Sequence, residues 1–404
     1  MNCLIVSEKL IKLTKELEDP KNPLLGPTMR GLYWFGLWPT GNRLRVLAFY
    51  SLHLFTVCFI FSELLDLYFV RHDTNKVLNN MSLTVLSVIC FAKSYSCNIR
   101  HQVWKKLIEG IAEEELLQKG TEDPVARKHM YDYTKYTRII TYLYWVLVFV
   151  TNLLLILTPF LKYATSQSYR DEIEMGIEPL PQILCSWFPF DNTKMPGYIV
   201  CFIIHVTMGT EGSGVLAAFD MTAVAIMSYL KGQMIILKDK CENLFTDTSS
   251  AQDVLDRIKE CHRHHNVLVK HYSMFDSLLS PTMFIYVLLC SITICGSVVQ
   301  FSSKEITPSQ KLWVIQYTVG LVSQLFLYCW HSNEVTIEVN KGIYGSDWWQ
   351  GDVRIRKQLL LLAGKLNQPF VLHAGPYTTL SVPTFIDIIK GSYSFFTLFS
   401  QMQE

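Results

Sequence analysis

Seven acidic or basic side chains occur within, or at the ends of, long apolar segments of this sequence. They are Glu63, Asp66, Lys93, Glu211, Asp220, Asp387 and Lys390. A charge inside a bilayer is costly, so such residues usually face protein or water and pair with one another. The chemistry open to them is ion pairing, recognition of a polar ligand, or the lining of a water-filled path.

Four of these residues have surroundings that predict a structural role or contact with water. Glu63 and Asp66 lie near the outer end of the first apolar segment, where we expect water to be close. Lys93 and Asp220 lie toward the inner ends of their segments. Snorkelling or pairing between helices would satisfy both of them there, so we expect a structural role for this pair.

Glu211 lies deeper in its segment, and small residues surround it: Gly209, Gly212 and Gly214. Small residues let helices approach closely or leave space for a cavity. Two interpretations stay open. Glu211 points into a ligand pocket, or it is a buried carboxyl group with partners in the protein.

Asp387 and Lys390 are three residues apart in the last apolar segment and can partly pair on one helix. A segment that carries these charges and still crosses lipid should have one face against water. This pattern is the first indication of a pore.

One cluster combines residue types that bind metal ions: Cys261, His262, His264 and His265. It lies in a charged segment without a second group of ligands nearby, so we expect a solvated helix face there and no metal site. The sequence has no phosphate-binding loop, no HExxH, no GxSxG and no dinucleotide-binding glycine pattern. We therefore expect neither an enzyme nor a cofactor.

The elements that must position these residues are long apolar segments. Half of the 404 residues are apolar and 18% are charged, whereas soluble domains carry about a quarter charged residues. A helix needs about 20 apolar residues to cross the hydrocarbon. The sequence therefore predicts an all-α, single-domain bundle over residues 1–404 with seven transmembrane helices, the last one weakened by its charges. The predicted spans cover about 46–69, 78–97, 139–161, 198–230, 283–301, 312–330 and 380–402.

Basic residues are distributed unequally between the loops. Of the 36 Lys and Arg residues, 27 lie in segments 1–45, 98–138, 231–272 and 331–378, and 7 lie in segments 71–76, 162–196 and 301–311. Basic loops stay in the cytoplasm, so we predict a cytoplasmic N-terminus and an extracellular C-terminus, the opposite of a G-protein-coupled receptor. The inner segments also look helical, so we expect helices to extend into the cytoplasm. The net charge of +1 predicts no nucleic-acid partner.

A pocket for a small ligand is mostly apolar with a few placed polar groups. The outer halves of the second, third, fourth and sixth spans offer such faces, although ordinary helix packing has the same spacing. The candidate ligand-binding residues are Leu83, Leu86, Ser87, Phe149, Asn152, Leu153, Ile156, Met208, Glu211, Gly212, Val215, Trp313, Gln316, Tyr317 and Gly320.

The last predicted span carries a dense pattern, formed by Ser381, Phe385, Ile389, Lys390, Ser392, Tyr393, Ser394, Phe396, Thr397 and Leu398. Further stretches agree with it: Trp187 to Asp191 with Pro196 and Tyr198, Tyr328 to Trp330 with Asn333 and Glu334, Tyr344 with Trp348 and Trp349, and Lys93 in the second span. Together they resemble the insect odorant receptors, in the right order from the second span to the end of the chain.

This resemblance implies a mechanism. Such receptors are subunits of tetrameric, nonselective cation channels in the plasma membrane of olfactory dendrites, in which a subunit tuned to a small volatile ligand assembles with a shared co-receptor. Alignment with the family's pore helix places Leu398, Gln401 and Met402 at the constriction, although contact with lipid or another helix is the alternative for Leu398 and Met402. The short inner loop after the fourth span resembles a tuned subunit and not the co-receptor.

Three other classes remain as alternatives. A gustatory receptor channel ranks second, because related gustatory receptors have a Gln where this chain has Phe399. A membrane transporter would require paired broken helices, and no inverted repeat is visible. A G-protein-coupled receptor is disfavoured by the distribution of basic residues.

Overall fold

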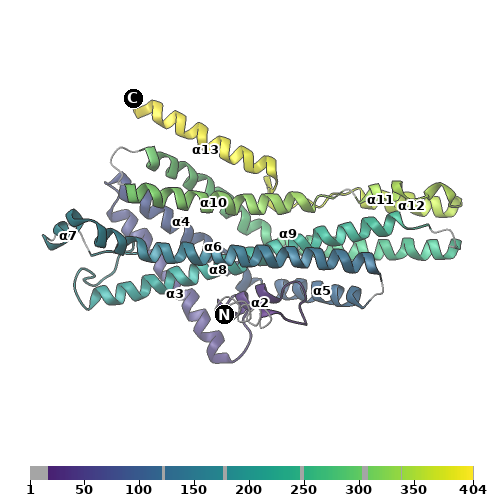
Figure 1. The fold of residues 1–404 in the computed structure, drawn as a ribbon, viewed down its shortest axis with the longest axis horizontal. Coiled ribbons are helices and arrows are strands. Elements are labelled where there is room, and N and C mark those ends of the chain that lie inside the picture. Colours follow the sequence, from purple (N-terminus) through teal and green to yellow (C-terminus); the bar gives the residue numbers. More distant parts are fainter. Residues whose placement is uncertain are drawn as a thin grey trace, which may run out of the picture.

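The protein is described here from a computed structural model that covers residues 17–120, 123–175, 180–245, 250–302, 308–337 and 339–403. These residues form a bundle of helices with one two-stranded hairpin (Figure 1). The helices are α2 (Gly26–Trp34), α3 (Arg43–Phe69), α4 (Thr74–Ile99), α5 (His101–Lys119), α6 (Pro124–Thr165), α7 (Gln167–Glu174), α8 (Gly197–Glu242), α9 (Ala251–Ser302), α10 (Pro308–Val335), α11 (Asn340–Gly345), the 3-10 helix η1 (Trp348–Gln350), α12 (Val353–Leu366) and α13 (Val382–Gln403).

Helix α8 forms the centre of the bundle, and α2, α4, α6, α9, α10 and α11 pack against it. Nearly every residue between 214 and 237 is buried. Two glycines make room for bulky neighbours. A Cβ atom on Gly214 would lie 1.9 Å from the Phe35 ring, and one on Gly232 would lie 2.2 Å from the Tyr133 ring. Larger side chains at these positions would force the neighbouring elements apart.

Three helices are much longer than a bilayer requires. Helices α6, α8 and α9 contain 42, 46 and 52 residues. At 1.5 Å per residue they are roughly 60–80 Å long, about twice the ~30 Å hydrocarbon thickness. The extra length lies at the end where α5, α11 and α12 pack beside them (Figure 1), and this end carries the basic segments described above. We call it the inner end. The expected extension of the helices beyond the bilayer is confirmed.

Five helices in the described part of the chain are long and apolar enough to cross a membrane: α3, α4 from Lys76 onward, α6, α8 and α9 up to Phe301. The sixth and seventh predicted spans coincide with α10 and α13. Each of the first six predicted spans lies within a single helix, whereas α13 begins at Val382, two residues after the predicted start.

Helices α3 and α6 present most of their apolar side chains outward. Their most hydrophobic stretches are only 17% and 6% buried. Leu54 of α3 and Leu143 of α6 are examples of large apolar side chains on these outward faces. A helix that is apolar on its exposed side requires an apolar surrounding, which the bilayer hydrocarbon provides.

Helix α9 contains Pro281, which lacks a backbone N–H and leaves the carbonyl of Ser277 without its partner in the helix. The Arg100 guanidinium donates to this carbonyl and so ties the turn between α4 and α5 to α9. The neighbouring carbonyl of Ser280 accepts a 3.1 Å hydrogen bond from the Gly375 N–H. The proline therefore frees one of the two carbonyls at which other elements attach to this long helix.

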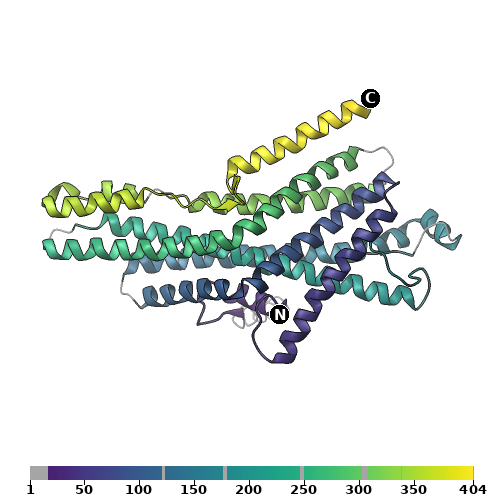
Figure 2. The ribbon, with the colours of Figure 1, turned by 180° about the vertical axis from the view of Figure 1, so that it is seen from behind.

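A short antiparallel hairpin, β1 (His373–Ala374) and β2 (Thr378–Thr379), leads into the last helix. Gly375 has a φ of 71° in this turn, a conformation that favours glycine. The hairpin packs on α9, and α13 then runs away from the bundle at an angle (Figure 2). The hairpin is a small exception to the all-α expectation.

Candidate functional site

A cavity lies between α3, α4, α6 and α8 in the half of the bundle opposite the inner end. Its volume is about 50 Å³. The segment that precedes α8 closes it with Leu184. The walls are mostly apolar, with a few polar side chains. The lining residues are Thr56, Phe59, Leu83, Leu86, Ser87, Cys90, Leu155, Leu184, Met208, Gly209, Glu211, Gly212 and Ser213.

Six of the sequence-predicted pocket residues meet at this cavity, all of them from α4 and α8: Leu83, Leu86, Ser87, Met208, Glu211 and Gly212. Residues of α3 were missed. Thr56, Phe59 and Glu63 are the buried residues of that helix, and they follow a spacing of three and four. Polar residues on one stripe of an otherwise apolar helix are the signal that would have indicated an inward-facing side.

The predicted residues of α6 are not brought together at the cavity. Phe149 and Leu153 are 67% and 43% exposed and point outward. The Asn152 amide donates a 3.4 Å hydrogen bond to Thr210 Oγ1. Ile156 packs against the small apolar cluster around Phe59. The structure therefore places Leu155, and not its predicted neighbours, in the cavity wall.

Val215 and three of the predicted residues of α10, Gln316, Tyr317 and Gly320, also lie away from the cavity. Val215 is buried in the main core. The Tyr317 hydroxyl donates to the Ser82 carbonyl at 2.8 Å, so it links α10 to α4. Gln316 is half-buried and Gly320 is exposed. The Trp313 side chain lies outside the described part of the structure.

Glu63 contradicts the expectation that water would be close to it, because its side chain is fully buried. The Ser87 hydroxyl donates to Glu63 Oε1 at 3.1 Å. Oε2 has no hydrogen-bond partner among the described residues. Glu63 thus lies directly behind the cavity wall that Ser87 forms. Asp66, one turn further out, is half-buried and accepts from the Asn80 amide at 2.6 Å.

Glu211 combines the two interpretations that the sequence left open. It lines the cavity, and its Oε1 lies 3.2 Å from His53 Nδ1 of α3. The same imidazole nitrogen lies 3.2 Å from the Ser94 hydroxyl, and His53 Nε2 lies 3.4 Å from the Gly36 carbonyl. The Glu211 side chain is 7% exposed, so it is a buried carboxyl group that has a partner in the protein and also lines the cavity.

Lys93 and Asp220 form a fully buried ion pair with 2.5 Å between Nζ and Oδ1. Three further side chains donate to the same carboxylate: Tyr144 at 2.7 Å, Gln324 at 2.5 Å and Tyr328 at 2.6 Å. One carboxylate therefore joins α4, α6, α8 and α10. It lies nine residues beyond Glu211 on α8, roughly 13 Å along the helix axis. The expected pairing of Lys93 and Asp220 between helices is therefore confirmed.

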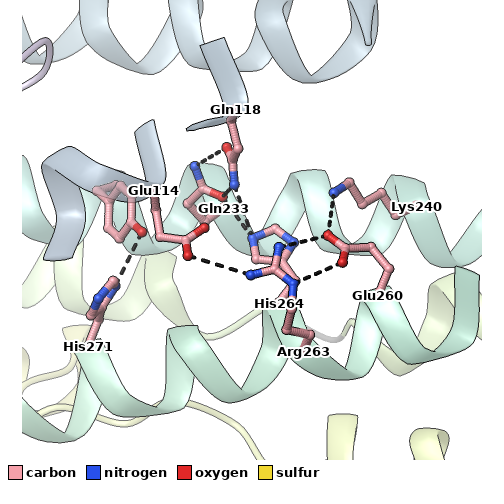
Figure 3. A network of polar contacts seen from close by, with 9 residues as sticks. Glu114, Gln118, Gln233, Lys240, Glu260, Arg263, His264 and His271 are labelled. Carbon is pink, nitrogen blue, oxygen red and sulfur yellow. Dashed lines mark hydrogen bonds and ion pairs between the residues drawn. The ribbon is translucent and has the colours of Figure 1, made fainter. Parts of the chain in front are cut away.

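The inner end holds a second buried polar network (Figure 3). Gln118 of α5 and Gln233 of α8 exchange two amide hydrogen bonds of 2.8 Å. His264 of α9 places Nε2 2.9 Å from Gln233 Oε1. At the edge of this network Arg263 pairs with Glu260 at 2.9 Å. The network fixes the register of α5, α8 and α9 relative to one another.

The expected solvated face at the Cys261 cluster is wrong. Cys261, His264 and His265 are 2–4% exposed, because their spacing of three and four places them on the stripe of α9 that packs into the core. Burial lowers the pKa of His264 to about 3, so its imidazole is neutral. No group of three or more His, Cys, Asp or Glu residues in the described ranges has a metal-binding arrangement.

Glu115 of α5 ties the segment before α2 to the inner end. Its carboxyl group accepts from the Leu24 N–H at 3.1 Å and from the Tyr133 hydroxyl at 2.9 Å. Burial raises the pKa of Glu115 to about 7, although these two hydrogen bonds act to lower it. Arg138 holds the same segment through a 2.6 Å ion pair with Glu18.

The predicted pore residues Leu398, Gln401 and Met402 fall in α13, and their side chains lie outside the described part of the structure. Earlier in this helix, Phe385, Ile388 and Ile389 pack against the core. Asp387 and Lys390 are exposed on the other side, and the described residues contain no ion pair between them. Their partial pairing is therefore not present.

Comparison with known proteins places this architecture in a family. The profile described as 7tm Odorant receptor matches residues 73–393. Odorant receptor Or2 of Anopheles gambiae is 23% identical over 352 residues, which cover 83% of this chain and 87% of that protein. Putative odorant receptor 85d of Drosophila melanogaster is 22% identical over 304 residues, or 73% of this chain and 68% of the relative.

Solved structures share the fold. The insect olfactory receptor OR5 from Machilis hrabei in complex with eugenol superposes with a TM-score of 0.75 over 95% of this chain and all of that one, at 15% identity. The structure of the same receptor described without eugenol gives a TM-score of 0.70 over 93% and 97% of the two chains. The expected seven-transmembrane helical bundle is therefore confirmed. With a family profile that matches most of its length, this chain belongs to the insect odorant receptor family, which consists of membrane receptors and not of enzymes.

Proposed function

We propose that the chain is an odorant-tuned subunit of a ligand-gated, nonselective cation channel in the plasma membrane of olfactory dendrites. A small volatile ligand binds in the cavity between α3, α4, α6 and α8, and a shared co-receptor completes a heterotetramer. The observation that carries the proposal is this mostly apolar cavity with a few oriented polar groups, the composition typical of small-molecule sites.

The size of the cavity supports a gating role for ligand binding. Pockets that hold drug-sized ligands measure about 300–1,000 Å³, and this cavity measures about 50 Å³. A volatile ligand therefore requires the surrounding helices to move apart. A ligand that fits only the widened form binds that form more tightly and shifts the population toward it.

The position of α13 supports a channel. Its exposed charges, Asp387 and Lys390, are costly against lipid but stable against water or another subunit. In a tetramer these faces would surround a central path, with Leu398, Gln401 and Met402 near its outer end. An apolar constriction blocks ions by dewetting, and widening of the helices restores water and conduction. The charge distribution of the loops supports an extracellular end for α13.

The proposal is tested by recording currents from cells that express the chain with a co-receptor during exposure to a panel of volatiles. We expect evoked cation currents that Gly209→Leu abolishes, because the new side chain fills the cavity that Gly209 lines. Gly320→Leu is the matched control, because a Cβ atom there meets no atom within 4 Å. Surface-expressed receptor that gives no current with any volatile, or an unchanged response in Gly209→Leu, would contradict the proposal.

A further inference from the structure

The polar groups of the cavity have an unusual hydrogen-bonding balance, because most of their hydrogens are already committed within the protein. The Thr56 hydroxyl donates to the Leu52 carbonyl at 3.1 Å. The Ser87 hydroxyl donates to Glu63 at 3.1 Å, and the Cys90 thiol donates to the Gly212 carbonyl at 3.4 Å. A hydroxyl has one hydrogen and two lone pairs, so Thr56 and Ser87 retain acceptor capacity only.

Glu211 adds further acceptor capacity to the same walls. A carboxylate has no hydrogen to donate, and only Oε1 of Glu211 is engaged by His53. Buried acceptors without a donor are costly, so they favour a ligand that supplies one.

Ser213 is the exception among the lining side chains that carry an exchangeable hydrogen, because it makes no hydrogen bond to another described residue and can still donate. The cavity therefore presents several acceptors and one available donor. An alcohol or phenol matches this set, since its hydroxyl donates once and accepts as well. Esters, ethers, aldehydes and ketones can accept from Ser213, but they have no hydrogen to donate and leave the acceptors Thr56, Ser87 and Glu211 without a donor.

We infer that this receptor selects volatiles that bear a hydroxyl group and discriminates against isomers whose oxygen can only accept a hydrogen bond. The inference rests on the proposed function of the cavity as the odorant site. Glu63 acts as a positioning residue, because it holds the hydrogen of Ser87 away from the ligand. Ser87 and Glu211 contact the ligand directly.

The test uses pairs of isomers with the same atoms and similar size, such as 1-octanol and 1-methoxyheptane, over several carbon skeletons. Binding is measured as ligand-induced thermal stabilisation of the purified receptor, and gating is measured separately as evoked current with the co-receptor. For skeletons that bind, we expect the alcohol to have about tenfold or higher affinity than its ether, because a hydrogen bond to a charged group contributes that much or more. Equal affinities across the panel would overturn the inference, as would tighter binding of 1-aminooctane than of 1-octanol, or no stabilisation by any alcohol.

Three variants locate the effect. Glu211→Gln and Ser87→Ala should reduce the ratio of the affinity for the alcohol to the affinity for the ether. Glu63→Gln should raise the affinity for the ether, since its amide can donate to Ser87 and release the serine hydrogen to the ligand. A merely structural role of Glu63 would weaken both ligands alike, and that result would contradict its assigned role. Ser291→Ala is the control, because that hydroxyl lies on α9 outside the cavity and donates to its own helix at 2.7 Å.

The two readouts separate this inference from the proposed function. Alcohol-selective stabilisation without any evoked current would support the inference and contradict the channel. Evoked currents that are as strong with ethers as with alcohols would support the channel and contradict the inference.

Discussion

The Asp220 carboxylate is the most highly connected side chain in the membrane-spanning part that the structure describes. It receives four donors from α4, α6 and α10, so its charge is compensated without water. The Lys93 ammonium lies 5.3–5.7 Å from the ring centres of Phe219, Tyr286 and Tyr328. Aromatic faces at this distance stabilise a cation. This centre therefore connects the cavity-forming helices α4 and α8 to α10.

Removal of one partner of the Lys93–Asp220 pair should strongly destabilise the protein. Lys93→Met leaves a buried carboxylate without its counter-ion, and we expect a loss of about 3–5 kcal/mol in the free energy of unfolding. The double variant Lys93→Met with Asp220→Leu should be more stable than Lys93→Met alone. Thermal unfolding of purified protein and surface expression measure both effects. Lys194→Met, which removes an exposed pair with Asp191, should change neither, and a Lys93→Met protein as stable as the wild type would contradict this account.

Glu115 should make the stability depend on pH near neutrality. Its folded pKa of about 7 lies above the usual 4.5 because the carboxyl group is buried. Below pH 4.5 both states are protonated, so the group carries no cost. As pH rises, the unfolded state releases its proton first, and stability falls until about pH 7. The total loss is about 3 kcal/mol at most, at 1.36 kcal/mol per pKa unit.

Unfolding midpoints between pH 5 and 8 test this sign. Glu115→Gln should flatten the decline in stability toward pH 8, whereas Glu113→Gln, on the exposed face of the same helix, should leave it unchanged. A decline of the same slope in Glu115→Gln and in the wild type would rule out Glu115 as its source.

At the scale of elements, close contact between α6 and α8 depends on Gly232. The Tyr133 ring that occupies the space beside it is held by its hydrogen bond to Glu115, so it cannot move aside easily. Gly232→Ala should lower the free energy of unfolding by about 1–3 kcal/mol. Gly364→Ala in α12 is the matched control. Gly364 lies in the last turn of α12, where an added Cβ atom meets open space, so the change should raise stability by up to about 1 kcal/mol. If calorimetry gave Gly232→Ala and Gly364→Ala the same change in the free energy of unfolding, the packing argument would be contradicted.

The positions of the helices were predictable because the bilayer imposes a minimum apolar length, which Arg43–Phe69 and Gly197–Glu242 satisfy visibly. Their inward faces were harder to predict. Lipid is as apolar as a leucine-lined core. Phe149, which points outward, and Leu155, which points inward, are therefore equally apolar, and hydropathy does not distinguish the two faces. Glycines beside a carboxyl group did identify the correct face of α8 around Glu211. The hairpin at His373 could not be predicted, because two-residue strands have no periodicity and depend on docking to α9.

At the scale of the whole molecule, the long helices connect two distinct environments. The cavity lies in one half of the bundle, and the Gln118–Gln233 network lies at the inner end of the same α8. Helix α8 packs against α2, α4, α6, α9, α10 and α11, and we propose that displacement at the cavity is transmitted along it toward the inner end. Helix α13 packs on α9 and α10, which join the same core, and its angle from the bundle is therefore coupled to their positions.

We propose that a ligand in the cavity opens a path lined by α13. The most direct measurement is the rate at which an external, membrane-impermeant cationic thiol reagent changes the current of Gln401→Cys, with the co-receptor present and the exposed Cys58 replaced by serine. We predict that an activating volatile accelerates this modification, because opening hydrates the constriction. Modification at the same rate with and without the volatile, in channels that conduct, would contradict the claim.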